Sequence, residues 1–119
     1  MTCLSELQKY VTLYATTENG YWLNEFDWKS VPVTFKEDLP EYIAGYYSFN
    51  GIALRNADVS SLFEIYVHEL RHRWQRVKHP VKYLLGKLYR PLIENDADAH
   101  QKYADDWFNK MADNNWRVN

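Results

Sequence analysis

The chain has 119 residues, of which 46% are hydrophobic and 17% aromatic, and it carries a formal net charge of −2 at pH 7. This length supports one small core, and the composition is that of a packed globular protein rather than a disordered one, so we expect a single domain over residues 1–119. No apolar run approaches the roughly 20 residues of a membrane-spanning helix, and residues 1–10 lack the blocks of a signal peptide. We therefore expect a cytoplasmic protein with no membrane partner, and the lone Cys3 fits a reducing compartment.

Helical periodicity is present at the start of the chain. Apolar side chains recur three and four positions apart over residues 2–17, which predicts a helix that covers the core and stops before Asn19-Gly20. Residues 21–30 are rich in aromatic side chains but have no clear period. The sequence therefore predicts one N-terminal helix and leaves the following ten residues without an assigned element.

Short strands are predicted next. Residues 31–35 favour a strand, and Pro32 places it toward the edge of a sheet because proline cannot donate a backbone hydrogen bond. Residues 46–49 and 52–55 flank Asn50-Gly51, a dipeptide that favours a type I′ hairpin turn. The sequence therefore predicts a small, mostly antiparallel sheet.

A second helix is predicted in the middle of the chain. Ser61 and Glu64 have the spacing of a capping box, so the helix should begin at about residue 61, and His79-Pro80 should end it. Its apolar residues step by three and four and form one stripe, made of Phe63, Val67, Leu70, Trp74 and Val77. His68 and His72 lie roughly opposite that stripe. They are either exposed to solvent or buried beneath another part of the fold. Buried imidazoles would need a polar partner such as a metal ion.

The most informative motif of the chain lies on this helix. Residues 68–72 are His-Glu-Leu-Arg-His, an HExxH pattern. Residues four apart share one face of a helix, so His68 and His72 can direct two imidazole nitrogens to one metal ion. Glu69, between them, can reach a water molecule on that ion. The motif therefore indicates a zinc hydrolase.

A third helix is predicted over residues 92–112, with Pro91 in its first turn. One side of it is apolar, with Ile93, Ala97, Ala104, Phe108 and Met111. Glu94, Asp98 and Asp105 fall on an adjacent face. Such an acidic face can be an ordinary solvated surface, but downstream of an HExxH helix it favours metal binding.

Residues 94–98 are Glu-Asn-Asp-Ala-Asp, and together with HELRH at 68–72 they resemble the gluzincin branch of the zincin metallopeptidases. The order of elements is similar to that of the minimal gluzincins, the minigluzincins. The resemblance implies an α+β fold, a minimal zincin-like domain with an N-terminal helix, a small mostly antiparallel sheet, an HExxH helix and a C-terminal glutamate helix.

The resemblance also implies roles for individual residues. His68, His72 and Glu94 would hold one Zn²⁺ ion, Glu69 would act as the general base, and Asp98 would orient a ligand histidine. Three protein ligands leave the fourth tetrahedral position for a water molecule, whose pKa zinc lowers to about 7. The implied activity is hydrolysis of a peptide bond, or a related amide bond, in a protein or peptide substrate. The residues whose type suits transition-state stabilisation are Tyr66, Arg71, Tyr83, Tyr89 and Tyr103.

Two features depart from the family pattern. Arg71 and Arg73 stand where the family usually has uncharged residues, and two cations beside a dication would weaken metal binding unless their charges point outward. Asp96 and His100 are alternative ligands, to be considered if Glu94 points away from the histidines.

Other classes of function remain open. Residues 71–90 contain seven Lys and Arg and no Asp or Glu, with Trp74, Tyr83 and Tyr89 among them. Cations interleaved with aromatics can bind single-stranded nucleic acid, although such runs are more often solvated surface. A non-catalytic interaction module is a further alternative, since a metal site does not by itself establish turnover. Residues 112–119, which include Trp116, are either a frayed terminus or a pseudo-substrate that lies in the cleft.

Overall fold

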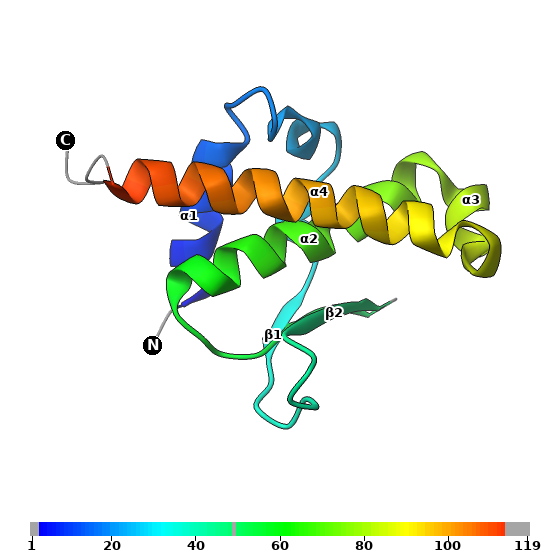
Figure 1. Cartoon of the computed structure of the whole chain (residues 1–119), viewed down its shortest axis with the longest axis horizontal. Helices are drawn as coiled ribbons and strands as arrows, with labels where there is room; N and C mark the ends of the chain where they lie inside the picture. The colour runs from blue at the N-terminus through cyan, green and yellow to red at the C-terminus, as the bar shows by residue number, and fades with distance from the viewer. Residues whose placement is uncertain (1–2, 49, 114–119) are drawn as a thin grey trace.

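A computed structural model describes residues 3–48 and 50–113, apart from the side chain of residue 87, and shows an α+β protein (Figure 1). Its elements in chain order are α1 (Leu4–Tyr14), the short 3₁₀ helices η1 (Tyr21–Glu25) and η2 (Trp28–Ser30), β1 (Val33–Phe35), β2 (Gly45–Ser48), β3 (Gly51–Leu54), α2 (Val59–Lys78), α3 (Pro80–Leu84) and α4 (Gly86–Asp113). The predicted fold class, with an N-terminal helix, a small sheet and two long helices, is confirmed.

The N-terminal helix α1 is shorter than predicted. It ends at Tyr14 because the hydroxyl of Thr17 donates to the carbonyl of Tyr14, and this local bond competes with the next helical turn. The chain then folds back so closely that a Cβ on Gly20 would lie 2.2 Å from the carbonyl oxygen of Tyr14. The aromatic segment that follows forms η1 and η2, which bury Trp22 and Trp28 in the core.

The sheet has the strand order β1-β3-β2 among the described residues. β2 pairs with β3 in antiparallel fashion, as the hairpin pattern predicted, and β1 lies at an edge, as Pro32 predicted. β1 is parallel to β3, however, so the small sheet is mixed, with one antiparallel and one parallel pairing among the described strands. Residues 36–44 connect β1 to β2, the two outer strands, and β3 then pairs between them.

The hairpin turn also differs from the prediction. Ser48 pairs with Gly51, so Gly51 is the first residue of β3 and not the second turn residue of a type I′ Asn50-Gly51 turn. Gly51 has a φ of +129°, which residues with a side chain rarely adopt, and a Cβ there would lie 2.5 Å from the carbonyl oxygen of Pro32. The glycine is therefore explained by close approach between β3 and the residue before β1.

α2 runs through the middle of the fold. It begins at Val59, two residues before the predicted start, because Ser61 donates its hydroxyl to the carboxylate of Asp58 rather than capping the helix itself. It ends before His79, as predicted. Phe63, Val67 and Leu70 on its apolar stripe are fully buried, whereas Val77 at the end of the stripe is about half exposed.

α4 lies along α2 over much of its length (Figure 1). It begins at Gly86, six residues before the predicted start at 92, and therefore contains Pro91, which lacks the N–H needed for a bond to the carbonyl of residue 87. Ala97 and Ala104 are fully buried. Their small side chains allow the two helix backbones to approach, which places the first half of α4 opposite His68 and His72.

The far end of α4 leads away from this region. Figure 1 shows the C-terminal end of α4 and the helix α3 at opposite ends of the molecule. The two predictions for the tail that includes Trp116, a frayed terminus or a pseudo-substrate, lie outside the described residues. No helix in residues 3–48 and 50–113 is long and apolar enough to cross a membrane.

Candidate metal centre

Two helices bring the three predicted ligands together. His68 and His72 lie one turn apart on α2, and Glu94 faces them from α4. One ligand atom of each residue lies within 4.8 Å of the others. Glu94 Oε1 is 3.5 Å from Nε2 of His68, and Glu94 Oε2 is 3.3 Å from Nε2 of His72. The group could therefore hold a metal ion.

The spacing of these atoms suits zinc. A tetrahedral Zn²⁺ ion with ligand distances of about 2.0–2.1 Å separates its ligand atoms by about 3.4 Å. Glu94 Oε1 lies 3.5 Å from His68 and Glu94 Oε2 lies 3.3 Å from His72, both close to that value, and one ligand atom of each residue lies within 4.8 Å of the others. Two imidazole nitrogens and a carboxylate oxygen are also a donor set that zinc prefers. In donor type and spacing, the three residues could therefore hold a metal ion.

Glu69 lies beside this group and is almost fully buried. Its Oε2 atom is 4.0 Å from Nε2 of His68. Burial, followed by the charge of Glu94, raises the pKa of Glu69 to about 8. A cation at the His-His-Glu group would favour the ionised carboxylate, so the protonation of Glu69 would be coupled to metal binding.

The second ring nitrogen of His68 faces Asp98. Nδ1 lies 3.4 Å from Asp98 Oδ1, but it makes no hydrogen bond with the described residues, and the Asp98 side chain is mostly exposed. Burial, followed by the proximity of His72, lowers the pKa of His68. Asp98 is thus correctly placed for the predicted role, although the role itself stays a prediction.

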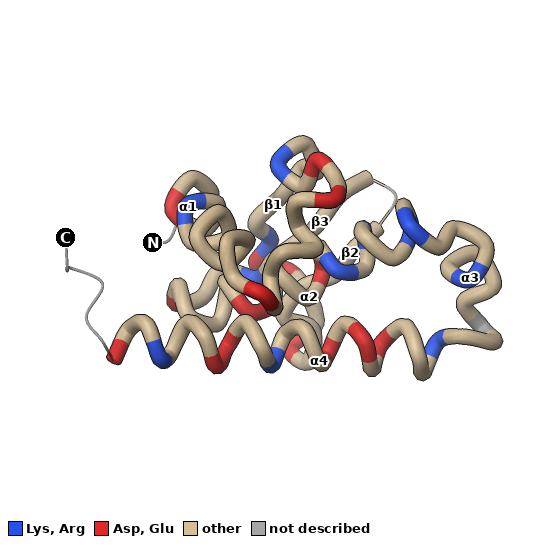
Figure 2. The backbone as a smooth tube through the Cα atoms, turned by 90° about the horizontal axis from the view of Figure 1, so that it is seen from above, with Lys and Arg blue, Asp and Glu red and all other residues tan. Residues whose placement is uncertain are grey.

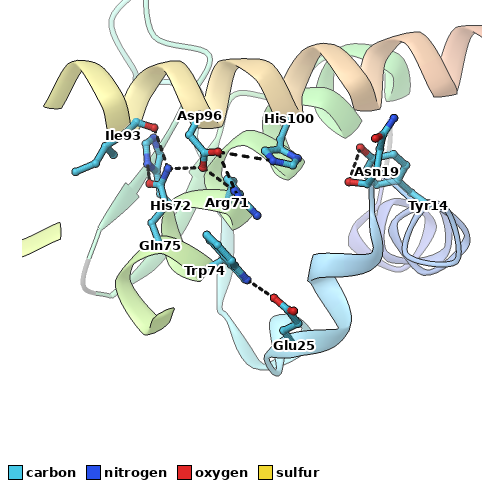
Figure 3. Close-up of polar contacts among 10 residues, drawn as sticks. All are labelled: Tyr14, Asn19, Glu25, Arg71, His72, Trp74, Gln75, Ile93, Asp96 and His100. Carbon is cyan, nitrogen blue, oxygen red and sulfur yellow. Dashed lines mark hydrogen bonds and ion pairs between the residues drawn. The ribbon is translucent and has the colours of Figure 1, made fainter. Parts of the chain in front are cut away.

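The second ring nitrogen of His72 has a partner that sequence analysis missed. Gln75 is buried, and its Nε2 atom donates to the carbonyl of Ile93 and to Oδ2 of Asp96, both at 2.9 Å (Figure 3). Because a carbonyl can only accept, Oε1 of Gln75 must be the atom that faces Nδ1 of His72, at 2.9 Å. Neutral His72 therefore carries its proton on Nδ1, and the lone pair of Nε2 faces Glu94.

The unexpected Arg71 does not face the metal group. Its guanidinium donates two hydrogen bonds to Asp96, at 2.7 and 3.2 Å, and its central carbon lies 3.6 Å from the ring centre of Trp74 (Figure 3). Burial raises the pKa of Asp96, but the hydrogen bonds from Arg71 and Gln75 outweigh it and lower that pKa overall. Arg73 donates to the hydroxyl of Tyr47. Both cations are thus held by side chains outside the His-His-Glu group.

The alternative ligands lie outside the group. Asp96 is bound to Arg71, and its Oδ1 atom lies 3.8 Å from Nε2 of His100. The His100 ring packs edge-on against Trp22. Burial, followed by the charge of Arg71, lowers the pKa of His100 to about 4. Because Glu94 does point toward the histidines, neither Asp96 nor His100 is needed to complete the group.

The His-His-Glu group opens into a cavity of about 500 Å³. One wall is formed by β2, through Gly45, Tyr46 and Tyr47, and the other by the α3–α4 corner, through Tyr83 and Arg90. Burial, followed by the proximity of Tyr47, raises the pKa of Tyr83 to about 12, so this hydroxyl keeps its proton at neutral pH. Tyr66, in contrast, is buried in the core. The wall residues from β2 were missed because their sequence signal was only that of a hairpin strand.

Comparison with protein-family models, with curated proteins and with solved structures finds no match to this chain. The resemblance to gluzincins therefore rests on the residues of the two motifs. The structure adds that these residues form a His-His-Glu group that could hold a metal ion, on an α+β fold.

Proposed function

We propose that the protein is a zincin-like, zinc-dependent metallopeptidase that hydrolyses peptide bonds or closely related amide bonds. The observation that supports this best is the convergence of His68, His72 and Glu94 beside the buried Glu69 in one open cavity. Bound zinc supplies a Lewis acid that polarises a carbonyl and lowers the pKa of a coordinated water molecule to about 7.

In this proposal, Glu69 moves the proton. Its carboxylate accepts a proton from the attacking water and passes it to the leaving amine. The Tyr83 hydroxyl, which lines the same cavity and stays protonated, can donate a hydrogen bond to the carbonyl oxygen of the substrate as negative charge develops there. Gln75 accepts from Nδ1 of His72 and so keeps the lone pair on Nε2, the atom that would hold the ion.

The strand β2 supports a peptide substrate. It is an edge strand of the sheet, and its residues Gly45–Tyr47 line the cavity. An edge strand presents unpaired backbone groups, to which an extended peptide can add as a further strand. The cavity therefore suits an extended segment of an unstructured protein better than a compact folded surface.

Replacing Glu69 tests the proposal. Glu69→Gln keeps the shape and removes the base, so we expect unchanged zinc content and hydrolysis of a labelled unstructured protein that is lower by about 100-fold or more. Glu64→Gln, on the same helix but outside the cavity, is the matched control and should keep its activity. Unchanged turnover in the Glu69 variant would exclude it as the base, and zinc-loaded wild-type protein without hydrolysis would favour a non-catalytic module.

A further inference from the structure

The α3–α4 corner carries an exposed cluster of aliphatic side chains, which we call the corner surface. It consists of Val81, Leu84, Leu85, Leu88 and Leu92. Leu84 and Leu88 are 79% and 77% exposed. A single exposed leucine is ordinary, but several neighbouring ones mark a surface that binds something. The proposed peptidase function does not explain them.

These side chains lie on one protruding part of the molecule. α3 and the first turns of α4 extend beyond the sheet at one end (Figure 1). Leu88 and Leu92 are four residues apart on one face of the early α4, and Leu85 lies in the turn just before this helix. Between them and α3, a Cβ on Gly86 would meet no atom within 4 Å. The corner surface is therefore open to solvent in the described structure.

Charge is strongly divided between this end and the rest of the chain. Residues 71–90 hold seven of the fourteen Lys and Arg and none of the sixteen Asp and Glu, so the remainder of the chain has a net charge of −9. Figure 2 shows basic and no acidic residues on α3, whereas the rest of the molecule carries residues of both charges. The molecule is thus polarised, with its basic end at the aliphatic cluster.

Exposed cations border the corner surface. Arg71 is held by Asp96, and Arg73 donates to Tyr47, so these cations are engaged within the fold. Lys78, Lys82 and Arg90 are exposed, and none forms a hydrogen bond or ion pair with another residue in the described part of the chain. Three cations next to an aliphatic cluster are chemically complementary to an anionic headgroup layer above hydrocarbon.

We propose that the corner surface docks on the anionic face of a phospholipid bilayer. Leu84 and Leu88 enter the boundary between headgroups and acyl chains, and Lys78, Lys82 and Arg90 contact lipid phosphates. The acidic remainder of the molecule is repelled by the same charge and faces away. Our expectation of no membrane partner came from the lack of a long apolar run, which a helix that lies in the interface does not need.

Lipid fits this surface better than nucleic acid does. Binding to single strands needs aromatic faces on which bases can stack. At this end of the molecule, Trp74 stacks on Arg71, and the ring of Tyr83 packs edge-on against Tyr47. The large hydrophobic side chains that are exposed at this end are aliphatic, and these offer bases no stacking partner.

Docking would bring the cleft to the lipid surface. Tyr83 and Arg90, which line the cavity of the His-His-Glu group, belong to the same corner as Leu84 and Leu88. A bilayer that holds this corner therefore also holds the cavity mouth close to its headgroups. Docking needs neither zinc nor turnover, so it can be tested apart from the proposed function.

Co-sedimentation of the full chain with vesicles tests the proposal. We expect the protein to bind phosphatidylcholine vesicles that contain phosphatidylglycerol. Its affinity should be lower by about 10-fold or more for vesicles of phosphatidylcholine alone, and likewise for the mixed vesicles at high salt. Leu84→Ser/Leu88→Ser and Lys82→Glu should each weaken binding by about 10-fold. The matched controls are Leu13→Ser, an exposed leucine on α1, and Lys110→Glu, an exposed lysine at the far end of α4. Circular dichroism checks that each variant is folded.

Several outcomes overturn the proposal. One is wild-type protein that stays in the supernatant with anionic vesicles, and another is equal loss of binding in the control variants. Tight binding of single-stranded DNA without vesicle binding would assign the basic end to nucleic acid. A wild-type dimer that Leu84→Ser/Leu88→Ser converts to a monomer, without any effect on lipid, would assign the corner surface to contact between two copies of the chain.

Discussion

At the scale of single residues, a chain of polar side chains reaches the candidate metal centre from behind. Arg71 binds Asp96, Asp96 accepts from Gln75, and Gln75 accepts from Nδ1 of His72. Each side chain in this series is hydrogen-bonded to the next, and polar groups inside a protein are stable when they are hydrogen-bonded. Arg71, which departs from the gluzincin pattern, thus helps to position His72, a candidate metal ligand.

This arrangement predicts the tautomer of His72. In wild-type protein without metal, long-range ¹H–¹⁵N spectra should show the proton of neutral His72 on Nδ1. Gln75→Leu removes the acceptor, so the proton should shift toward Nε2, and zinc affinity should fall by about 10- to 100-fold. His79, exposed beyond the end of α2, is the internal reference. A His72 spectrum that is the same in both proteins would contradict the assignment.

The sequence indicated some site residues but not others, for physical reasons. His68 and His72 could be paired because four-residue spacing on a helix is a local property. Glu94 came from the resemblance to a family motif. Gln75 could not be found, because its role depends on the carbonyl of Ile93, which only the packing of α4 on α2 brings near. Interactions between distant segments leave no periodic signal in the sequence.

At the scale of elements, the start of β3 depends on one glycine. Gly51→Ala should destabilise the protein by about 1–3 kcal/mol, because its φ is positive and the new Cβ would meet Pro32. Gly86→Ala is the matched control, since its Cβ would enter open space at the start of α4, and we expect a change within about 1 kcal/mol. Urea unfolding measures both. Equal effects of the two changes would contradict this account of the hairpin.

Glu64, on the side of α2 that packs against α4, should make the stability of the protein depend on pH. Burial, followed by its contact with Asp105, raises the pKa of Glu64 to about 7 from an ordinary value of 4.5. The folded state therefore binds more protons than the unfolded state between these values, so this residue's contribution to stability falls as pH rises from about 4.5 through about 7.

Replacement of Glu64 should remove that loss. In metal-free protein, the free energy of unfolding of Glu64→Gln relative to wild type should be higher at about pH 8 than at about pH 5. The difference should be less than about 2 kcal/mol because the side chain is partly exposed. Glu6→Gln, on the exposed side of α1, controls for the loss of one charge. A stability difference between Glu64→Gln and wild type that is the same at both pH values would be inconsistent with the raised pKa.

The sequence predicted which elements exist better than where they begin. The start of α4 was missed by six residues because a proline was assumed to open the helix, whereas here the helix continues through Pro91. The parallel pairing of β1 with β3 was missed because each strand pattern is local and does not specify its partner.

At the scale of the whole molecule, α2 is covered on several sides. It contacts α1, the strands β2 and β3, and the helices α3 and α4. This explains why His68 and His72, which lie off the apolar stripe, have little exposure: a central helix has no face that is fully solvated. The sequence left open whether these histidines are solvated or lie beneath a second layer, and in the structure they lie beneath a second layer.

The central claim is that His68, His72 and Glu94 form a zinc site, and metal content of the purified protein tests it most directly. Wild-type protein should bind about one equivalent of zinc, and His68→Ala/His72→Ala should bind none. His79→Ala/His100→Ala removes two histidines outside the group and should keep about one equivalent. Stoichiometric zinc in the first double variant, or its loss only in the second, would contradict the ligand assignment.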